Sequence, residues 1–250
     1  MKPLRSLARA LGIRRARRDT EAFAVQRRLV PSEEPTIFDV GAHLGETARR
    51  YRALFPRAHI HCFEPFPASF EALRSSVAGD ERIRVQQLAV SDSPGRANLN
   101  VNRSKATNSL LPSDERAAAY WGESLLDTDD TVEVTVTSLD AFCAEHAIAH
   151  IDILKLDVQG GEFQVLTGAS TLLRKQAIDV VYMEMITAPT YVGQHDLHEY
   201  LGLFRAHGYV LFDFYNPVRK NGRLLQTDNL LVADRFLAAY ERALRANGAS

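Results

Sequence analysis

The stretch Thr36–Thr47, with the sequence TIFDVGAHLGET, predicts a buried strand, a tight glycine turn and the start of a helix. Its first five residues are mostly β-branched or aromatic, as in buried strands, and Asp39 lies near their end. Gly41 and Gly45 follow, and a glycine permits a backbone conformation that a side chain would block. Such a strand–turn–helix unit builds a small-ligand site at the carboxyl edge of a parallel sheet.

The spacing of the glycines narrows the choice of ligand. A dinucleotide fingerprint needs three glycines, G-x-G-x-x-G, whereas His43 occupies the middle position here. This argues against a nicotinamide or flavin dinucleotide. Asp39 is placed to pair with an amino group, and S-adenosylmethionine (SAM) offers an ammonium group, a carboxylate and a ribose. An ordinary βα turn without a ligand is the alternative that this stretch alone leaves open.

Length and composition describe one large α/β domain. The chain has 250 residues, of which 46% are apolar, enough for a substantial core. Seven bases precede the first acid, leaving 23 of the 30 bases against 31 acids, a net charge of −8. We expect no nucleic acid partner, since phosphate binding needs a basic track. Two cysteines without metal-ligand spacing suit a reducing compartment, and no apolar run spans a bilayer, so we expect a cytoplasmic protein.

The basic residues before the first acid belong to a leader, residues 1–23. Leu4, Leu7 and Leu11 recur at helical spacing, with arginines on the other faces. This pattern suits an amphipathic helix that makes a peripheral contact with an anionic membrane surface. A loosely ordered, solvated leader is the alternative. The remaining residues, 24–250, are expected to form a single domain.

A second predicted strand, His59–Glu64, ends in an acid. Glu64 lies 25 residues after Asp39, close to the offset at which α/β nucleotide sites hold ribose hydroxyls. The pairing of a glycine turn with a strand-two acid is more specific than either feature alone. A third strand is expected over residues 83–90.

The alternation of strands and helices is interrupted over residues 96–138. Short alternating strands are expected at 97–102 and 132–138, with a polar region between them. A long connection beside a site is commonly a lid or a specificity loop. We therefore expect an insertion or lid here, with a plain surface excursion as the alternative.

The strand–helix rhythm resumes with the apolar strands Ile151–Val158 and Ile178–Met185. Residues 216–227 (NPVRKNGRLLQT) follow strand Tyr209–Tyr215 and show no helical pattern, although a parallel crossover normally needs a helix. The last strand, Asn229–Ala233, is therefore expected to be antiparallel to its neighbour. The predicted fold is α/β: a seven-stranded, mostly parallel sheet with an antiparallel C-terminal hairpin and helices on both faces. That is the class I, Rossmann-like fold of SAM-dependent methyltransferases.

These segments resemble the FkbM family of SAM-dependent methyltransferases. The resemblance is carried by FDVGAHLGET (38–47), FEP (63–65), LAVSD (88–92), TSLDAF (137–142), ILKLDVQGGEFQVLTGA (153–169) and DNLLV (228–232). The 153–169 block is the most specific, and family members usually show K-x-D-x-E-G-x-E there. In this chain Gln159 replaces the first glutamate of that pattern, and His43 stands where asparagine is usual.

The resemblance implies transfer of a methyl group from SAM to a hydroxyl of a sugar, a glycan or a small natural product. The motifs do not name the acceptor, because fold-level likeness says little about substrate. A catalytically inactive SAM-fold protein that serves as a binding or assembly partner is the alternative, kept open by Gln159. Nothing in the pattern demands an oligomer.

The resemblance also assigns roles at the cofactor site. Gly41, Ala42 and Gly45 would surround the methionine part of SAM, with Asp39 near its ammonium group, and Glu64 would hold the ribose hydroxyls. The candidate cofactor residues further include His43, Thr47, Pro65, Asp157 and, beside the adenine, Ala89, Val90 and Ser91.

Methyl transfer to a neutral hydroxyl requires that a proton be removed. The candidates are Asp157 at the end of a central strand, Glu184 at the end of the next one, and Glu162, which opens a helix expected over 161–175. Either Asp157 or Glu184 is a general base, or the two bind Mg²⁺, which orients and acidifies the hydroxyl. Lys155 shares a strand face with Asp157, and it either pairs with that carboxylate or contacts the acceptor.

Overall fold

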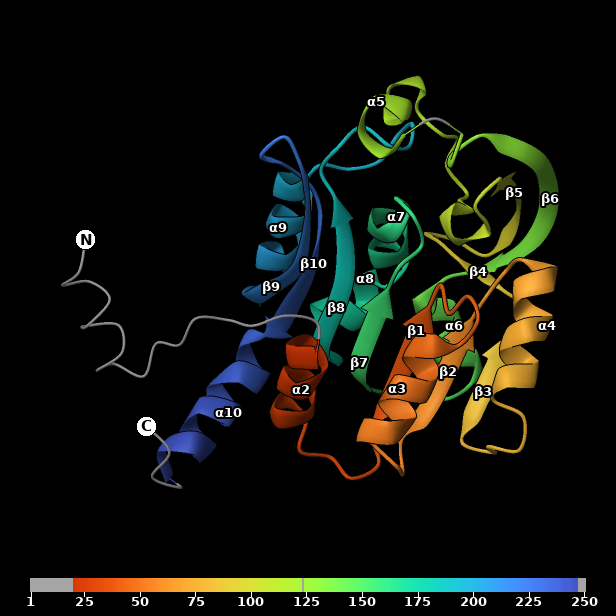
Figure 1. The fold of residues 1–250 in the computed structure, drawn as a ribbon. Coiled ribbons are helices and arrows are strands. Elements are labelled where there is room, and N and C mark those ends of the chain that lie inside the picture. Colours follow the sequence, from red (N-terminus) through yellow and green to blue (C-terminus); the bar gives the residue numbers. More distant parts are fainter. Residues whose placement is uncertain (1–19, 123, 247–250) are drawn as a thin grey trace.

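The computed structural model describes residues 20–122 and 124–246 (Figure 1). Its main sheet has seven strands: β3 (Ile83–Gln86), β2 (His59–Phe63), β1 (Thr36–Val40), β7 (Ile151–Leu156), β8 (Ile178–Ile186), β10 (Arg223–Ala233) and β9 (Tyr209–Lys220), in that spatial order. The first five strands are parallel, whereas β10 is antiparallel to both β8 and β9. The expected sheet with its antiparallel C-terminal hairpin is therefore confirmed.

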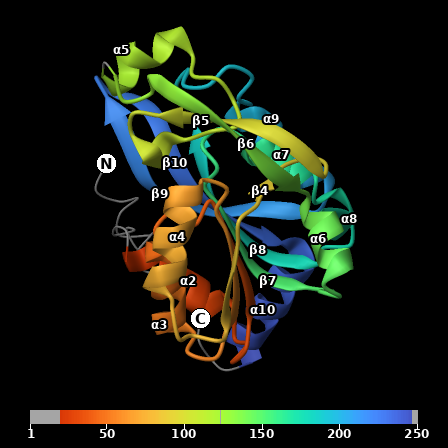
Figure 2. The same ribbon diagram turned by 90° about the vertical axis from the view of Figure 1, so that its right-hand side faces the viewer.

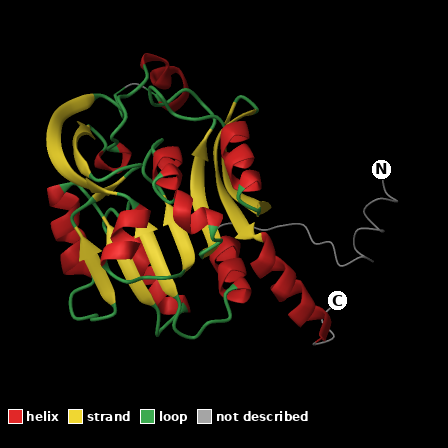
Figure 3. Ribbon diagram, turned by 180° about the vertical axis from the view of Figure 1, so that it is seen from behind, coloured by secondary structure: helices red, strands yellow, loops and turns green. Residues whose placement is uncertain are grey.

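Helices cover both faces of this sheet (Figure 3). One face packs against α2 (Thr20–Leu29), α3 (Glu46–Leu54), α4 (Pro67–Ser76) and α10 (Asp234–Ala246). The other packs against α6 (Leu139–Glu145), α7 (Glu162–Thr167), α8 (Ser170–Arg174) and α9 (Leu197–Ala206). Successive side chains of a strand point to opposite faces, so Ile37 of β1 enters the first core while Phe38 and Val40 enter the second.

Two expected elements are divided in the structure. The strand expected over 83–90 is two strands in different sheets, because β4 (Ala89–Val90) leaves the main sheet and pairs with β6 (Thr128–Thr137). The helix expected over 161–175 is broken between α7 and α8 at Gly168. The chain passes so close there that a Cβ atom on Gly168 would lie 2.1 Å from the carbonyl oxygen of Ser91.

The interruption expected over 96–138 is a second, smaller sheet with three short helices. The sheet order is β4-β6-β5, and β5 (Gly95–Asn102) pairs with β6 in antiparallel register, as the alternating pattern predicted. Between these strands lie η1 (Lys105–Thr107), η2 (Glu115–Ala117) and α5 (Ala118–Trp121). Figures 1 and 2 show this second sheet above the carboxyl ends of the main-sheet strands.

The expected leader, residues 1–23, overlaps the described domain at its last four residues. Residues 20–23 belong to α2, and Ala22 and Phe23 are buried in the core, so the described domain starts upstream of the expected boundary. Residues 1–19 lie outside the described residues. Among the helices that the structure describes, none combines the length and the apolar character needed to cross a membrane.

Candidate functional site

Two cavities meet at the carboxyl edge of the main sheet. The first, which we call the enclosed cavity, has a volume of about 170 Å³ and lies between the turns after β1 and β2, the end of β4, residues 105–111 and α7. The second, which we call the polar cleft, has a volume of about 250 Å³ and is lined by side chains that include Glu46, Arg50, Lys155, Glu184 and Asp228. Asp157 lines both, so it lies between the two cavities.

Gly41 makes the turn after β1 possible. Its φ angle is +77°, and a Cβ atom there would lie 1.8 Å from the carbonyl oxygen of Asp157. The two strand ends are this close because the Asp157 N–H donates to the carbonyl oxygen of Val40 over 3.0 Å. The close approach of the end of β7, more than any ligand, therefore requires a glycine at position 41. Gly41 also lines the enclosed cavity.

Glu64 lines the enclosed cavity and is held in one orientation. Its Oε2 accepts from the His43 N–H over 2.9 Å, and its Oε1 accepts from the Phe66 N–H over 3.0 Å. Burial raises the pKa of this carboxyl, and the two N–H groups oppose that rise. Each oxygen retains acceptor capacity for a hydroxyl of a bound ligand.

Several other predicted cofactor residues also line the enclosed cavity. These are His43, Pro65, Ala89, Val90, Ser91 and Asp157. They lie together because the carboxyl ends of β1, β2 and β7 meet at one edge of the sheet, and cofactor binding by them stays a prediction. The end of β4 joins them although it belongs to the second sheet.

In the part of the chain that the structure describes, four predicted cofactor residues do not line this cavity. Asp39 is fully buried, and Lys155 Nζ lies 3.0 Å from its Oδ1. Asp39 therefore pairs with Lys155 and not, as expected, with the ammonium group of a ligand. Ala42 is buried in the core. Gly45 packs against α4, where a Cβ atom would lie 2.7 Å from Leu73 and Ser76, and Thr47 lines the polar cleft instead.

Lys155 ties the glycine turn to β7. Its Nζ donates to the carbonyl oxygen of Gly41 over 2.9 Å, and it lies 3.8 Å from Asp157 Oδ2. Burial opposes the charge, but the carboxylates of Asp39 and Asp157 outweigh it and raise the pKa of Lys155. Its main partner is therefore Asp39, whereas the sequence suggested Asp157 or an acceptor.

The structure brings Asp157 and Glu184 together through one amide. Gln159 Nε2 donates to Asp157 Oδ1 over 2.7 Å and to Glu184 Oε2 over 3.1 Å. Gln226 Nε2 donates to the other oxygen of Glu184 over 2.8 Å. Burial, together with the negative charge of Asp157 nearby, raises the pKa of Glu184 well above its ordinary value. The structure thus places these two carboxylates side by side, and their catalytic role stays a prediction.

Glu162, the third predicted carboxylate, faces the protein interior. It is 1% exposed, and its Oε1 accepts from the Val158 N–H over 2.8 Å, which closes the turn before α7. Burial raises its pKa to about 7. Among the described residues that line the two cavities, Glu162 does not occur. It therefore does not join Asp157 and Glu184 in one cleft, as was expected.

The bridging amide bears on the Mg²⁺ hypothesis. Gln159 Nε2 occupies the place between Asp157 and Glu184 that a shared cation would need. In the described part of the chain, one group of three or more potential metal ligands comes close together: His150, Asp152 and Asp179. It lies where β7 and β8 begin, at the opposite edge of the sheet from the two cavities.

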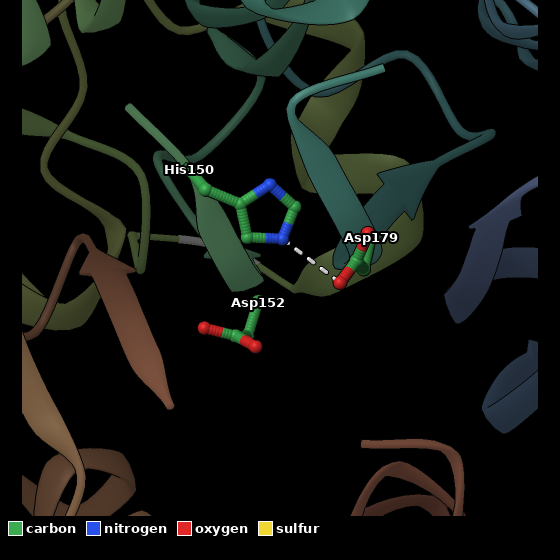
Figure 4. A group of neighbouring side chains, drawn as sticks. All are labelled: His150, Asp152 and Asp179. Carbon is green, nitrogen blue, oxygen red and sulfur yellow. Dashed lines mark hydrogen bonds and ion pairs between the residues drawn. The ribbon is translucent and has the colours of Figure 1, made fainter. Parts of the chain in front are cut away.

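The side chains of that distant group bond within the protein. His150 Nε2 lies 2.9 Å from Asp179 Oδ2, and Asp152 Oδ2 accepts from the Thr36 N–H over 2.8 Å. Figure 4 shows the dashed bond between His150 and Asp179, with the Asp152 carboxylate beside them. The group therefore links the starts of three neighbouring strands.

Sequence reasoning missed several residues of the two cavities. The polar cleft is also lined by residues of five elements that only the fold brings together: Phe23, Arg50, Tyr182, Asn216 and Asp228. The Asp228 carboxylate accepts from the Tyr182 hydroxyl over 2.7 Å and from Asn216 Nδ2 over 2.6 Å. Asn108 and Gln164 also line the enclosed cavity; Gln164 lies in the 153–169 block, but the sequence motifs gave neither residue a role.

The fold and the cavities together define a class of protein. A parallel sheet with a glycine turn after β1, an acid directly after β2 and an antiparallel last strand is the architecture of class I SAM-dependent methyltransferases. The enclosed cavity suits SAM chemically, since Glu64 offers carboxylate oxygens for a ribose. It also holds a buried donor, Asn108 Nδ2, and a buried acceptor, Gln164 Oε1, neither with a partner among the described residues.

Comparison with known proteins gives the family. The sequence profile of the Methyltransferase FkbM domain matches residues 39–211, so this chain belongs to the FkbM family of SAM-dependent methyltransferases. It is 29% identical over 198 residues to the 2-O-methyltransferase NoeI of Sinorhizobium fredii (strain NBRC 101917 / NGR234), covering 75% of this chain and 79% of that protein. It is 29% identical over 205 residues to the 31-O-demethyl-FK506 methyltransferase FkbM of Streptomyces tacrolimicus, covering 73% and 75%.

Among solved structures, the SAM-bound magnesium protoporphyrin IX methyltransferase ChlM of Synechocystis PCC 6803 aligns with a TM-score of 0.47 and 9% identity, over 86% of this chain and 78% of that one. The family assignment rests on the sequence profile. It establishes a SAM-dependent methyltransferase, as the sequence predicted.

Proposed function

We propose that this chain transfers a methyl group from SAM to a hydroxyl of a sugar, a glycan or a small natural product. The observation that carries the proposal is the position of Asp157, which lines both the enclosed cavity and the polar cleft. A cofactor in the first and an acceptor in the second would meet at this carboxylate. The names of the relatives NoeI and FkbM specify transfer to oxygen, which supports a hydroxyl acceptor.

Residues around the enclosed cavity would hold the cofactor. Glu64, fixed by two backbone N–H groups, would accept hydrogen bonds from both ribose hydroxyls. Gly41 and His43 would border the methionine part, and the end of β4 with Ser91 would lie beside the adenine.

When bound, SAM supplies a methyl carbon on a positively charged sulfur, and transfer of that carbon to oxygen leaves a neutral thioether. The Asp157–Glu184 pair would accept the hydroxyl proton as the new carbon–oxygen bond forms. Burial and the nearby negative charge of Asp157 raise the pKa of Glu184, so this carboxylate takes up a proton readily. We favour this pair as general base over Mg²⁺ because the Gln159 amide bridges the two carboxylates.

The polar cleft would receive the acceptor. Arg50, Asn216 and Asp228 line it with polar groups, which suits a molecule rich in hydroxyl groups. Phe23 and Tyr182 also line the cleft, but both side chains are largely buried in the core.

The insertion would act as a lid over the cofactor. Residues 105–111 line the enclosed cavity, and Ser109 Oγ donates to the carbonyl oxygen of Gln159 over 2.7 Å. Tyr191 hydroxyl lies within hydrogen-bonding distance of both the Thr107 carbonyl oxygen (3.1 Å) and Gln159 Oε1 (2.9 Å). These bonds would fasten the lid beside the catalytic carboxylates. We further propose a cytoplasmic location, with any peripheral membrane contact made by the basic leader.

The test is methyl transfer itself. The purified protein is incubated with SAM and a panel of hydroxylated sugars, glycans and macrolides, and S-adenosylhomocysteine (SAH) release is measured with the mass of each acceptor. Asp157→Asn and Glu184→Gln should each lower kcat by roughly 10²- to 10⁴-fold, whereas Glu71→Gln, an exposed carboxylate on α4, should have no effect. Full activity in either variant would contradict the proposed base. Binding of SAH without turnover of any acceptor would favour the inactive binding partner instead.

A further inference from the structure

Two amide side chains in the wall of the enclosed cavity carry buried atoms that lack a partner in the part of the chain that the structure describes. These atoms are Asn108 Nδ2, a donor, and Gln164 Oε1, an acceptor. Buried polar atoms in native proteins are almost always paired, so an unpaired donor and an unpaired acceptor around one cavity indicate a ligand that offers the complementary groups.

The orientation of the Asn108 amide is fixed by the backbone. Its Oδ1 accepts from the Asn102 N–H over 2.9 Å, which identifies the other atom as the Nδ2 donor. The neighbouring Ser109 is anchored on both sides, through its carbonyl oxygen to the Asn100 N–H over 2.8 Å and through its Oγ to Gln159. Asn108 is therefore held over the cavity by the insertion.

Gln164 lines the same cavity from α7. The Gly168 N–H donates to its carbonyl oxygen over 2.9 Å, and Gly168 packs directly against Ser91. Gln164 thus lies one helical turn from the end of β4, where Ala89, Val90 and Ser91 line the cavity.

Part of the cavity wall is apolar. It includes Leu88, Val90, Leu99 and Leu110. A flat heterocycle with an apolar face and polar edges matches this environment. Among the parts of SAM, that describes the adenine ring, which has one donor, its exocyclic amine, and three ring-nitrogen acceptors.

We propose that Gln164 and Asn108 recognise the adenine of the cofactor, with Gln164 Oε1 accepting from the exocyclic amine and Asn108 Nδ2 donating to a ring nitrogen. Amide side chains pair with the edge of adenine in this way in other complexes. The ribose hydroxyls do not compete for these groups, because Glu64 already offers them acceptors. The inference rests on the proposed cofactor site and adds two residues that select for adenine.

The first test compares two ligands by calorimetric titration: SAH, and its purine-riboside analogue in which hydrogen replaces the exocyclic amine. The wild-type protein should bind the analogue roughly 5- to 150-fold more weakly than SAH, because Gln164 Oε1 stays buried and unpaired. Gln164→Met keeps the length of the side chain and removes the acceptor, so it should bind both ligands with similar affinity. Gln87→Met, an exposed control outside the cavity wall, should discriminate as the wild type does.

The second test uses Asn108→Asp, which keeps the acceptor for the Asn102 N–H and removes the donor. SAH affinity should fall, and one of the 1-, 3- and 7-deaza analogues of SAH should bind the wild type weakly yet match SAH in the variant. Thermal melting checks that each variant is folded. Equal binding of SAH and its purine-riboside analogue by the wild type would overturn the role of Gln164, and deaza analogues that all bind the wild type as SAH does would overturn that of Asn108. Failure of the wild type to bind SAH at all would instead refute the proposed cofactor site.

Discussion

Replacing Gly41 by alanine should destabilise the protein far more than the same change at another left-handed glycine. The matched control is Gly79, whose φ angle is +87° and around which no atom lies within 4 Å of an added Cβ. Gly79→Ala therefore reports the backbone strain alone, about 1–2 kcal/mol. Gly41→Ala adds a collision at 1.8 Å with the carbonyl oxygen of Asp157.

The collision cannot be relieved by rotating a side chain, because the obstructing atom belongs to the backbone of the neighbouring strand. The carbonyl must retreat by more than 1 Å to reach the roughly 3.0 Å that Cβ contacts require, which pulls apart the bond between the Asp157 N–H and Val40. Losing a buried hydrogen bond costs about 1–3 kcal/mol. The strain and the lost bond together predict about 2–5 kcal/mol for Gly41→Ala.

Urea denaturation of the wild type and the two variants measures these differences, provided that the slopes with denaturant agree. SAH titration of the folded variants gives the functional consequence, since Gly41 and Asp157 both line the enclosed cavity. Gly41→Ala should weaken SAH binding, whereas Gly79→Ala should not. If the two variants lose equal stability, the reasoning that the approach of β7 dictates this glycine is refuted.

Three further predictions concern charged groups. Lys155→Met leaves the Asp39 carboxylate buried without its partner and should cost about 3–5 kcal/mol of unfolding free energy, measured by urea denaturation; a loss below 1 kcal/mol would contradict the assigned pairing. The hydrogen bond to Asp179 raises the pKa of His150 above 6.5 in the folded protein. The resulting stabilisation of the folded state is complete below about pH 6.5 and is lost as the pH rises through the pKa that His150 has in the folded state. His150→Gln should therefore flatten the dependence of melting temperature on pH in that window. Because the pKa of Glu184 is raised, kcat should increase with pH through a value well above 4.5, and Asp157→Asn, which removes a neighbouring negative charge, should move that limb to lower pH in a pH–rate profile; an unmoved limb would exclude Glu184 as the titrating group.

Local sequence patterns were sufficient to predict the main sheet and the direction of its last strand. Residues 36–47 and Glu64 are adjacent in sequence to the strands that position them, so the glycine turn and the strand-two acid could be read directly. The antiparallel last strand followed from the missing helix in residues 216–227, where the chain continues as β9 and β10 joined by a tight turn at Asn221 and Gly222.

What the sequence could not predict depends on contacts between distant strands. Asp39 and Lys155 are opposite each other in the register of β1 and β7, so the buried ion pair exists only once the sheet has formed. Likewise Gln159 bridges two carboxylates that are 27 residues apart, and its φ angle of +57° aims the side chain in a way that no propensity scale anticipates. The departure of Gln159 from the family pattern was visible, but its partners were not.

The amides Asn108 and Gln164 illustrate the same limit. Asn108 lies in a loop of the insertion and Gln164 on a short helix, and neither belongs to a periodic pattern. Only the folded structure shows that each side chain lines the cavity and carries a buried atom without a partner among the described residues.

The central claim is that the enclosed cavity beside Glu64 holds SAM while Asp157 faces an acceptor next to it. Calorimetric titration of the purified protein with SAM and SAH, repeated with Glu64→Gln, tests it most directly. We predict 1:1 binding by the wild type and an affinity at least about tenfold lower for the folded variant, because charge-assisted hydrogen bonds to the ribose are lost. Unchanged affinity in Glu64→Gln, or no binding by the wild type, would contradict the account.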